Sequence, residues 1–239
     1  MGWRAWFGLG PPLLEASLRE RVTRWAKLPA PKLNIPLDDA RLIVVDVETT
    51  GMDPARDALL SIGAVRLQGR ALDLGESFHG LVLPDRQSTR ENILVHGIAP
   101  SQQAQGEPAD EILVRFLEYC GADPLMAFHA PFDRSFLSRA ARRGLGIRLR
   151  NPFIDMAWVL PALFPHALPS RSGLDDWARH FNLQISRRHA ADADALATGE
   201  LLLVALAEAR RQSIATLQQL MTLASRTAKL APPGPTGGA

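Results

Sequence analysis

One stretch organises this chain: Leu42-Ile43-Val44-Val45-Asp46-Val47-Glu48-Thr49-Thr50-Gly51. Successive side chains point to opposite faces of a β-strand, so Asp46 and Glu48 are predicted to share one face, and Val45 and Val47 the other. Two carboxylates in the middle of an apolar strand are unfavourable unless a cation compensates their charge. The stretch therefore predicts a buried strand with a divalent-metal site, and its final glycine permits a turn.

The composition is typical of a soluble globular protein. The 239 residues are 46% hydrophobic and 22% charged, enough for one large domain with extensions. The single cysteine, Cys120, excludes an internal disulfide and suits a reducing compartment. The longest apolar run, 201–207, is far shorter than the ~20 residues of a membrane span, and the N-terminus lacks the pattern of a signal peptide. We therefore expect a soluble, cytoplasmic protein.

Positive charge is concentrated in one segment, although the formal net charge is only +2. Residues 134–150 contain six arginines and no acid: Arg134, Arg139, Arg142, Arg143, Arg148 and Arg150. Such a run is most often a solvated helix face, but beside an acidic metal site it could hold a phosphate backbone.

Strand signals dominate residues 41–83, and helix and strand signals alternate after that. Alternating apolar residues and turn signals predict three strands in an antiparallel meander, at 41–48, 59–67 and 72–83. Residues 84–106 are predicted to be mostly loop. Later elements are expected at 107–119 (helix), 124–128 (strand), 132–143 (helix), 153–154 (strand), 155–163 (helix), 172–181 (helix, capped by Ser172), 191–209 (helix) and 214–229 (helix). Together they predict a mixed α/β domain.

The chain divides into four predicted parts. Residues 1–40 form an N-terminal extension, with a helix at about 13–27 and a proline-rich linker, and 41–210 form the main domain. A C-terminal helix is expected within 211–230, followed by a disordered tail at 231–239. The extension is rich in tryptophan, which could mark a site for a protein partner or could fold back onto the main domain.

Two later acids are expected at the beginnings of helices. Asp133 follows the strand at 124–128, and Asp194 lies in the first turns of the helix at 191–209, five residues after His189. The helix dipole favours carboxylates near helix N-termini, so each acid alone fits a first-turn residue without catalytic meaning. Their combination with the two acids of the first strand is more specific for a metal site.

These motifs resemble those of the DEDDh (DnaQ-like) 3′→5′ exonucleases, a family that includes the proofreading subunit of bacterial replicative DNA polymerase, oligoribonuclease and ribonuclease T. Residues 46–51 with 61–65 resemble the first motif, 130–133 the second, and His189 with Asp194 the third. The resemblance implies a ribonuclease H-like fold, with a mixed central sheet of an antiparallel three-strand meander plus parallel strands, flanked by helices. The part at 41–210 would then be the exonuclease domain.

The resemblance also implies the chemistry of the site. Asp46, Glu48, Asp133 and Asp194 would bind two divalent ions, with Asp46 bridging them. Carboxylate oxygens favour Mg²⁺ or Mn²⁺ over Zn²⁺, and two such ions can promote phosphodiester hydrolysis. His189 would be the general base, because a histidine with an ordinary pKa near ~6.5 can accept a proton at neutral pH.

Seven further residues are expected to contact the substrate: Thr49, Thr50, Gly51, Met52, His96, His129 and Phe132. Met52 stands where family members usually carry a leucine that wedges between the last bases. Phe128 and His129 occupy positions where the family commonly has His-Asn, which changes the expected contacts to the terminal nucleotide but leaves the metal ligands intact.

The expected activity is release of nucleoside monophosphates from the 3′ ends of single-stranded or frayed DNA, with RNA as an open alternative. Two other functions are compatible with parts of the sequence. One is a non-catalytic nucleic-acid-binding module that retains the fold, which the complete set of acids argues against. The other is a polymerase-accessory role through residues 1–40. Oligomeric state and pathway stay open.

Overall fold

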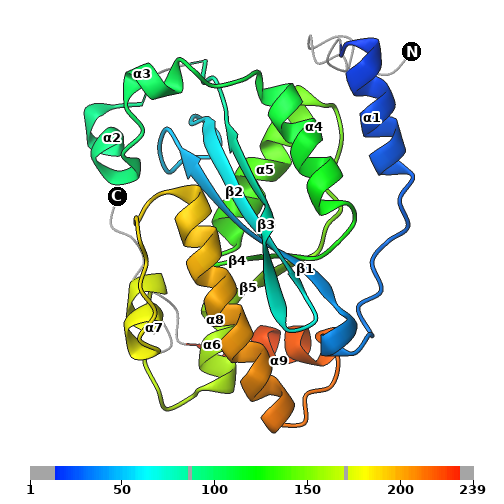
Figure 1. Cartoon of the computed structure of the whole chain (residues 1–239), viewed down its shortest axis with the longest axis vertical. Coiled ribbons are helices and arrows are strands. Elements are labelled where there is room, and N and C mark those ends of the chain that lie inside the picture. Colours follow the sequence, from blue (N-terminus) through cyan, green and yellow to red (C-terminus); the bar gives the residue numbers. More distant parts are fainter. Residues whose placement is uncertain (1–13, 86–87, 170–171, 232–239) are drawn as a thin grey trace.

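A computed structural model describes residues 14–85, 88–169 and 172–231, which contain one five-stranded sheet in the order β3-β2-β1-β4-β5 (Figure 1). The three long strands, β1 (Arg41–Thr49), β2 (Leu59–Gln68) and β3 (Ala71–Leu81), form an antiparallel meander. The short strands β4 (Leu125–Ala127) and β5 (Phe153–Asp155) run parallel to β1. The predicted mixed sheet is confirmed.

The helices pack on both faces of this sheet. In chain order they are α1 (Ala16–Ala26), α2 (Arg90–His96), α3 (Pro100–Gln103), α4 (Ala109–Cys120), α5 (Pro131–Gly144), α6 (Met156–Leu163), α7 (Leu174–His180), α8 (Ala191–Arg211) and α9 (Leu217–Leu230). A short 3₁₀ turn, Leu37–Asp39, leads into β1.

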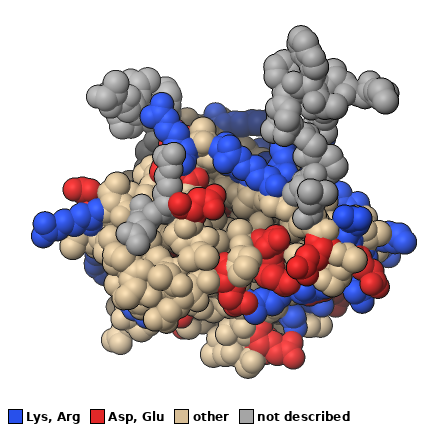
Figure 2. All heavy atoms as spheres, turned by 90° about the horizontal axis from the view of Figure 1, so that it is seen from above, with Lys and Arg blue, Asp and Glu red and all other residues tan. Residues whose placement is uncertain are grey.

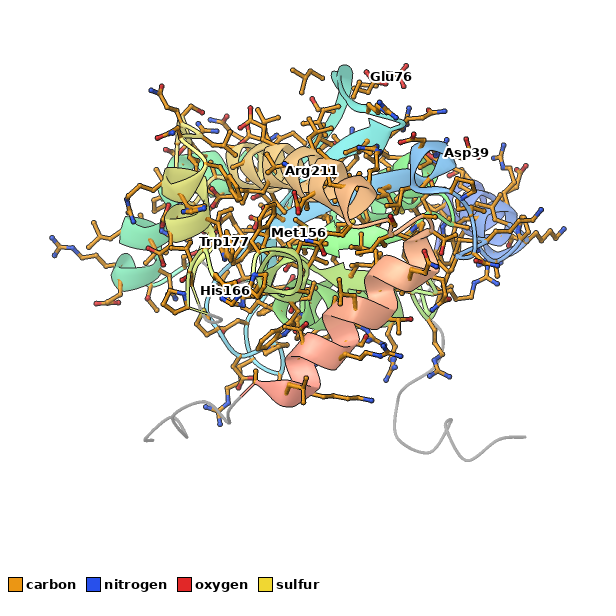
Figure 3. The ribbon with its side chains drawn as sticks, turned by 90° about the horizontal axis from the view of Figure 1, so that it is seen from below. Asp39, Glu76, Met156, His166, Trp177 and Arg211 are labelled. Carbon is orange, nitrogen blue, oxygen red and sulfur yellow. The ribbon has the colours of Figure 1, made fainter. Side chains whose placement is uncertain are left out.

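Alternation along β1 divides the buried apolar residues into two cores. Leu42 and Val44 belong to a core shared with α6, α8 and α9, whereas Val45 and Val47 belong to the core shared with α4 and α5. Figure 1 shows α8 crossing the first of these faces. In Figure 3, Met156 and Trp177 lie in the interior of the molecule, and both are almost fully buried. Asp46 and Glu48 therefore share one face of β1, as the alternation predicts, and the structure shows that this is the face covered by α8.

Two predictions between the main elements are wrong. Residues 84–106 contain α2 and α3 instead of being mostly loop. The side chain of Thr89 accepts the Asn92 N–H at the start of α2, and Gly97 ends it with a φ of 68°. The prediction failed because α2 is short and its Leu94 and Val95 are exposed, so it lacks the inward apolar stripe that marks most helices.

Ser172 is not the N-terminal cap of α7. The helix begins at Leu174 with Gly173 as the capping residue, and the Gly173 N–H donates to Asp176 Oδ2 at 3.0 Å. Here the side chain of a first-turn aspartate accepts the N–H of the capping residue, and no side chain of the capping residue itself takes part because it is glycine.

The described part of the N-terminal extension lies against the sheet domain. Trp25 of α1 is buried, its indole N–H donates to the Gly121 carbonyl at 2.7 Å, and the Arg150 guanidinium lies over its ring. In the linker, the Ile35 carbonyl accepts the Leu217 N–H at the start of α9. The tryptophans at positions 3 and 6, and the predicted tail from residue 232, lie outside the described residues.

None of the helices in the described ranges is long and apolar enough to cross a membrane.

Candidate active site

The site forms where the C-terminal half of β1 meets the first turns of α8. Asp46 pairs with Gly63 of β2 in the sheet register. A Cβ atom at Gly63 would lie 2.2 Å from the backbone carbon of Ala191, so only glycine lets α8 begin this close to β2. That close approach brings Asp194, in the first turn of α8, beside the two acids of β1.

Three carboxylates meet at this junction. One oxygen each from Asp46, Glu48 and Asp194 lies within 4.8 Å of the others. Burial, followed by repulsion from Asp133, Glu48 and Asp194, raises the pKa of Asp46 well above its ordinary value. Burial and then Asp194 raise the pKa of Glu48 to about 7. Their negative charges are thus insufficiently compensated by the protein itself.

Asp133 reaches the same cavity from α5 and is held by β1. Its Oδ1 accepts the N–H of Val47, the residue between Asp46 and Glu48, at 3.1 Å. The strand β4 pairs with β1 only at Ile43 and Val44, so it ends before it could pair with this donor. Burial raises the pKa of Asp133 well above its ordinary value, against the opposing effect of its backbone hydrogen bonds. Asp133 lies outside the three-carboxylate group.

Asp194 has one occupied and one unoccupied oxygen. Its Oδ2 accepts the backbone N–H of His189 at 3.0 Å and a hydrogen bond from Arg188 Nη1. Its Oδ1 is buried and has no hydrogen-bond partner among the described residues. A buried carboxylate oxygen without a donor is unfavourable in a metal-free protein and is suited to a cation.

Arg188 provides the nearest positive charge. Besides its bond to Asp194, its Nε donates to Asp175 Oδ1 at 2.5 Å. Its charge opposes the upward pKa shifts of Asp46 and Glu48. The single positive charge of this guanidinium cannot balance the negative charge of several carboxylates. Additional cations would therefore be favoured at the site.

Two histidines of the site share an unusual backbone conformation. His129 has a φ of 62° and His189 a φ of 58°, both in the left-handed region that is uncommon for residues other than glycine. Each backbone N–H donates to an aspartate: His129 to Asp155 Oδ1 and His189 to Asp194 Oδ2, both at 3.0 Å. Both side chains are exposed at the cavity. Such conformations often occur at functional sites.

A cavity of about 560 Å³ joins these groups, and Thr50 is the one sequence-predicted site residue absent from its lining. The Thr50 hydroxyl accepts the Ala58 N–H, and its carbonyl accepts a hydrogen bond from the Asn92 side chain. The predicted residues that line the cavity are Asp46, Glu48, Asp133, Asp194, His189, Thr49, Gly51, Met52, His96, His129 and Phe132.

His96 lines the cavity with both ring nitrogens already engaged. Its Nδ1 accepts the Ile98 N–H at 3.0 Å, and its Nε2 lies 3.1 Å from the Ser88 hydroxyl. Burial lowers its pKa, which favours the neutral ring. These contacts fix the end of α2 against the cavity.

Sequence reasoning missed three polar lining residues: Asn92, Asp175 and Arg188. Asn92 lies on α2, which was not predicted, although Thr89 and Gly97 are the capping signals that could have revealed it. Asp175 and Arg188 lie 13 positions apart in the chain and meet only through the fold.

The donor set of the cavity fits divalent cations. It includes the carboxylates of Asp46 and Glu48, whose pKa values are raised, and the buried Oδ1 of Asp194, which has no hydrogen-bond partner among the described residues. No cysteine of the described residues lines the cavity. Hard oxygen ligands of this kind suit Mg²⁺ or Mn²⁺.

Comparisons with known proteins agree with this arrangement. A family model named RNase_T and described as Exonuclease matches residues 43–202. A PolC-type DNA polymerase III from Thermotoga maritima is 30% identical over 186 residues, which are 77% of this chain and 13% of that protein. A DNA polymerase III subunit epsilon-like protein from Rhodobacter capsulatus is 31% identical over 190 residues, 78% of this chain and 27% of that protein. The chain thus spans a small part of the length of these relatives.

The fold is also found in a solved exonuclease. The structure of E. coli exonuclease I in complex with a dA16 oligonucleotide superposes with a TM-score of 0.63 at 21% identity, over 72% of this chain and 42% of that one. This similarity confirms the predicted ribonuclease H-like fold.

Proposed function

Because this chain belongs to the RNase T family of exonucleases, with the DEDDh set of acids and histidine, we propose that it is a metal-dependent 3′→5′ exonuclease. It would release nucleoside monophosphates from the 3′ ends of single-stranded or frayed DNA. The observation that carries this proposal is the group of Asp46, Glu48 and Asp194, with one oxygen of each within 4.8 Å of the others.

The four acids would hold two divalent ions. Asp46, Glu48 and Asp194 form the close group, and Asp133 lines the same cavity from α5, beside the backbone of β1. When bound, the ions would supply positive charge that offsets the negative charge of the reacting phosphate and of its leaving oxygen. The Val47 N–H fixes the Asp133 carboxylate, so this ligand is positioned before any ion arrives.

His189 is the proposed general base. The oxygen of the attacking water forms the new bond to phosphorus, and its proton passes to the imidazole. The bond from phosphorus to the 3′ oxygen of the preceding nucleotide breaks, that oxygen takes a proton from solvent, and a nucleoside 5′-monophosphate leaves. The hydrogen bond from the His189 backbone to Asp194 fixes the position of the base relative to one of the proposed metal ligands. This would hold the attacking water, bound near His189, in line with the phosphate.

Apolar and aromatic residues of the same cavity suit the terminal nucleotide. Met52 is 78% exposed at the cavity mouth, and such a flexible apolar side chain can insert between two bases. Phe132 and the exposed His129 ring offer flat surfaces for stacking. DNA is favoured over RNA because the curated relatives are named as DNA polymerases.

Direction and metal dependence are tested with labelled oligonucleotides. A single-stranded DNA carrying a 3′ label should lose that label as a mononucleotide in the first turnovers, whereas the same DNA with a 5′ label should give a ladder of progressively shorter strands. Excess EDTA should stop both reactions, and Mg²⁺ or Mn²⁺ should restore them. Early release of the 5′ label as a mononucleotide would contradict the direction, and activity in EDTA would contradict the metal dependence.

RNA and double-stranded DNA of the same sequence as the single-stranded DNA test which nucleic acid the protein prefers as substrate. We expect single-stranded DNA to be degraded faster than blunt duplex DNA, because the cavity must receive a separated 3′ end. Binding of every substrate without turnover of any would instead support the alternative of a non-catalytic nucleic-acid-binding module.

A further inference from the structure

The arginine run at residues 134–150 divides into two groups in the structure. Arg139 donates to the Ala55 carbonyl, and Arg150 donates to the Ala26 carbonyl at 2.8 Å. The remaining members are without a hydrogen bond or salt bridge to any described residue: Arg134, Arg142, Arg143 and Arg148. Figure 2 shows that basic and acidic side chains both occur on one face of the molecule, in line with the net charge of only +2.

Three of these arginines line a second hollow of about 500 Å³, which we call the arginine groove. Arg134, Arg142 and Arg148 form its charged wall, Leu149 and Phe153 its apolar part, and the segment 130–131 separates it from the catalytic cavity. The first turn of α5 is therefore a shared wall, with Phe132 and Asp133 in the cavity and Pro131 and Arg134 in the groove.

We infer that the arginine groove binds the phosphate backbone of the nucleic-acid strand whose 3′ end occupies the catalytic cavity. The inference rests on the proposed exonuclease function for the choice of ligand. Arg134, Ser138 and Arg142 are spaced four residues apart, so they lie along one face of α5 and span a rise of about 12 Å. That length corresponds to several nucleotides of a stacked strand, whose axial rise is about 3.4 Å per nucleotide.

The chemistry of the groove favours a polyanion. Guanidinium groups bind phosphate oxygens through paired hydrogen bonds, and all three arginines are exposed with their donors available. The helix dipole explains a basic residue in the last turn of α5, such as Arg142, but it does not explain Arg134 in the first turn or Arg148 beyond the helix.

One acid also lines the groove, and its interactions reduce its conflict with phosphate. Asp155 Oδ1 accepts two backbone N–H groups, those of His129 and Ala157, both at 3.0 Å. One of these donors, His129, lies directly before the segment 130–131 that separates the two hollows. A strand passing over this segment would go from the catalytic carboxylates directly to the arginines.

The test measures binding and catalysis separately in the full chain. Binding of a fluorescent single-stranded DNA 20-mer is followed by anisotropy over a range of KCl concentrations, with Ca²⁺ present. For the double variant Arg142→Ala/Arg148→Ala we expect several-fold weaker binding, and a slope of log affinity against log salt that falls by about 0.7 for each arginine removed. The matched control is Arg24→Ala/Arg226→Ala, which removes two exposed helical arginines far from the groove residues in sequence and should leave the slope unchanged.

Catalysis is followed with the p-nitrophenyl ester of thymidine 5′-monophosphate, which is too small to reach the groove from the cavity. The groove variant should keep wild-type kcat on this ester while its KM for the 20-mer rises. Inactivity of the wild type on both substrates, combined with the expected loss of binding in the groove variant, would reject the exonuclease function and retain the groove.

Two results overturn the inference itself. One is identical affinity and salt slope for the wild type and the groove variant. The other is displacement of the 20-mer by an oligoglutamate peptide at lower concentration than by unlabelled DNA, because that result would assign the groove to an acidic protein segment.

Discussion

Two hollows lie on opposite sides of the first turn of α5, and the side chains that line them carry opposite charges. In the cavity of the candidate active site, burial and mutual repulsion raise the pKa values of Asp46, Glu48 and Asp133. In the arginine groove, Arg134, Arg142 and Arg148 are exposed and have no acidic partner among the described residues. The cavity is thus incomplete without cations and the groove without a polyanion, and a nucleic-acid strand with divalent ions would satisfy both.

The largest expected effect comes from the cavity side of this comparison. Asp46→Asn removes a charged ligand without changing the size of the side chain, so exonuclease activity should fall to background while the salt dependence of DNA binding stays that of the wild type. The groove variant Arg142→Ala/Arg148→Ala should show the opposite pattern. Steady-state kinetics and anisotropy on the same preparations check both, and a kcat defect in the groove variant equal to that of Asp46→Asn would remove the distinction between the two hollows.

The two left-handed histidines allow a matched test of the general base. His189→Ala should lower kcat by about 10²–10⁴-fold, the usual contribution of a positioned acid or base. His129→Ala, at a residue with a similar φ in the same cavity, should chiefly raise KM because its ring is expected to contact the terminal nucleotide. Pre-steady-state rates with the labelled 20-mer distinguish the outcomes. Equal losses of kcat in the two variants would count against His189 as the base.

Gly63 tests how the cavity is assembled. Gly63→Ala places a methyl group 2.2 Å from the Ala191 backbone, so α8 must shift and carry Asp194 away from Asp46. We expect a stability loss of about 1–3 kcal/mol, as for other overpacked sites, together with reduced activity but an unchanged salt slope of DNA binding. Chemical denaturation measures the first. The control is Gly75→Ala in β3, which should be near neutral because the nearest atom to a Cβ there, Asp73 Oδ1, is 3.7 Å away.

The raised pKa of Glu48 predicts that the stability of the metal-free protein depends on pH. Folding raises this pKa from 4.5 to about 7, so the metal-free folded protein binds the proton more tightly than the unfolded chain does. The stabilisation is therefore fully present below pH 4.5 and is lost as the pH rises through 7, with a total on the order of 3 kcal/mol. Melting temperatures of the EDTA-treated protein should fall between pH 5 and pH 8.

Two comparisons isolate the source of this pH dependence. Glu48→Gln should flatten the curve, and saturating Mg²⁺ should raise the melting temperature more at pH 8 than at pH 5. The groove variant should keep the wild-type curve, because its arginines do not titrate in this range. A melting temperature of the metal-free wild type that increases toward pH 8 is incompatible with the raised pKa values.

The elements with strong local signals could be predicted from the sequence. The alternation in β1 gave the correct face for Asp46 and Glu48, because one side of the strand must pack against the core below α8. The short helix α2 was missed, since its Leu94 and Val95 are exposed and produce no amphipathic stripe toward the core. Its caps were readable, but a seven-residue helix has little other signal.

Other features of the site depend on distant parts of the chain. The hydrogen bond of Asp133 to Val47 requires knowing that β4 ends after three residues and leaves this N–H free. The need for glycine at position 63 follows from the location of Ala191, and the pairing of Arg188 with Asp194 and Asp175 follows from the path of the loop before α8. Sequence motifs could identify the residues, whereas the fold determines their partners.

Binding of Mn²⁺ to the full chain, measured by electron paramagnetic resonance, tests the central claim about the cavity most directly. We predict two Mn²⁺ ions bound per wild-type chain at pH 8, loss of this binding in Asp46→Asn, and wild-type binding in Arg142→Ala/Arg148→Ala. Absence of bound Mn²⁺ in the wild type, or full binding retained in Asp46→Asn, would contradict the account.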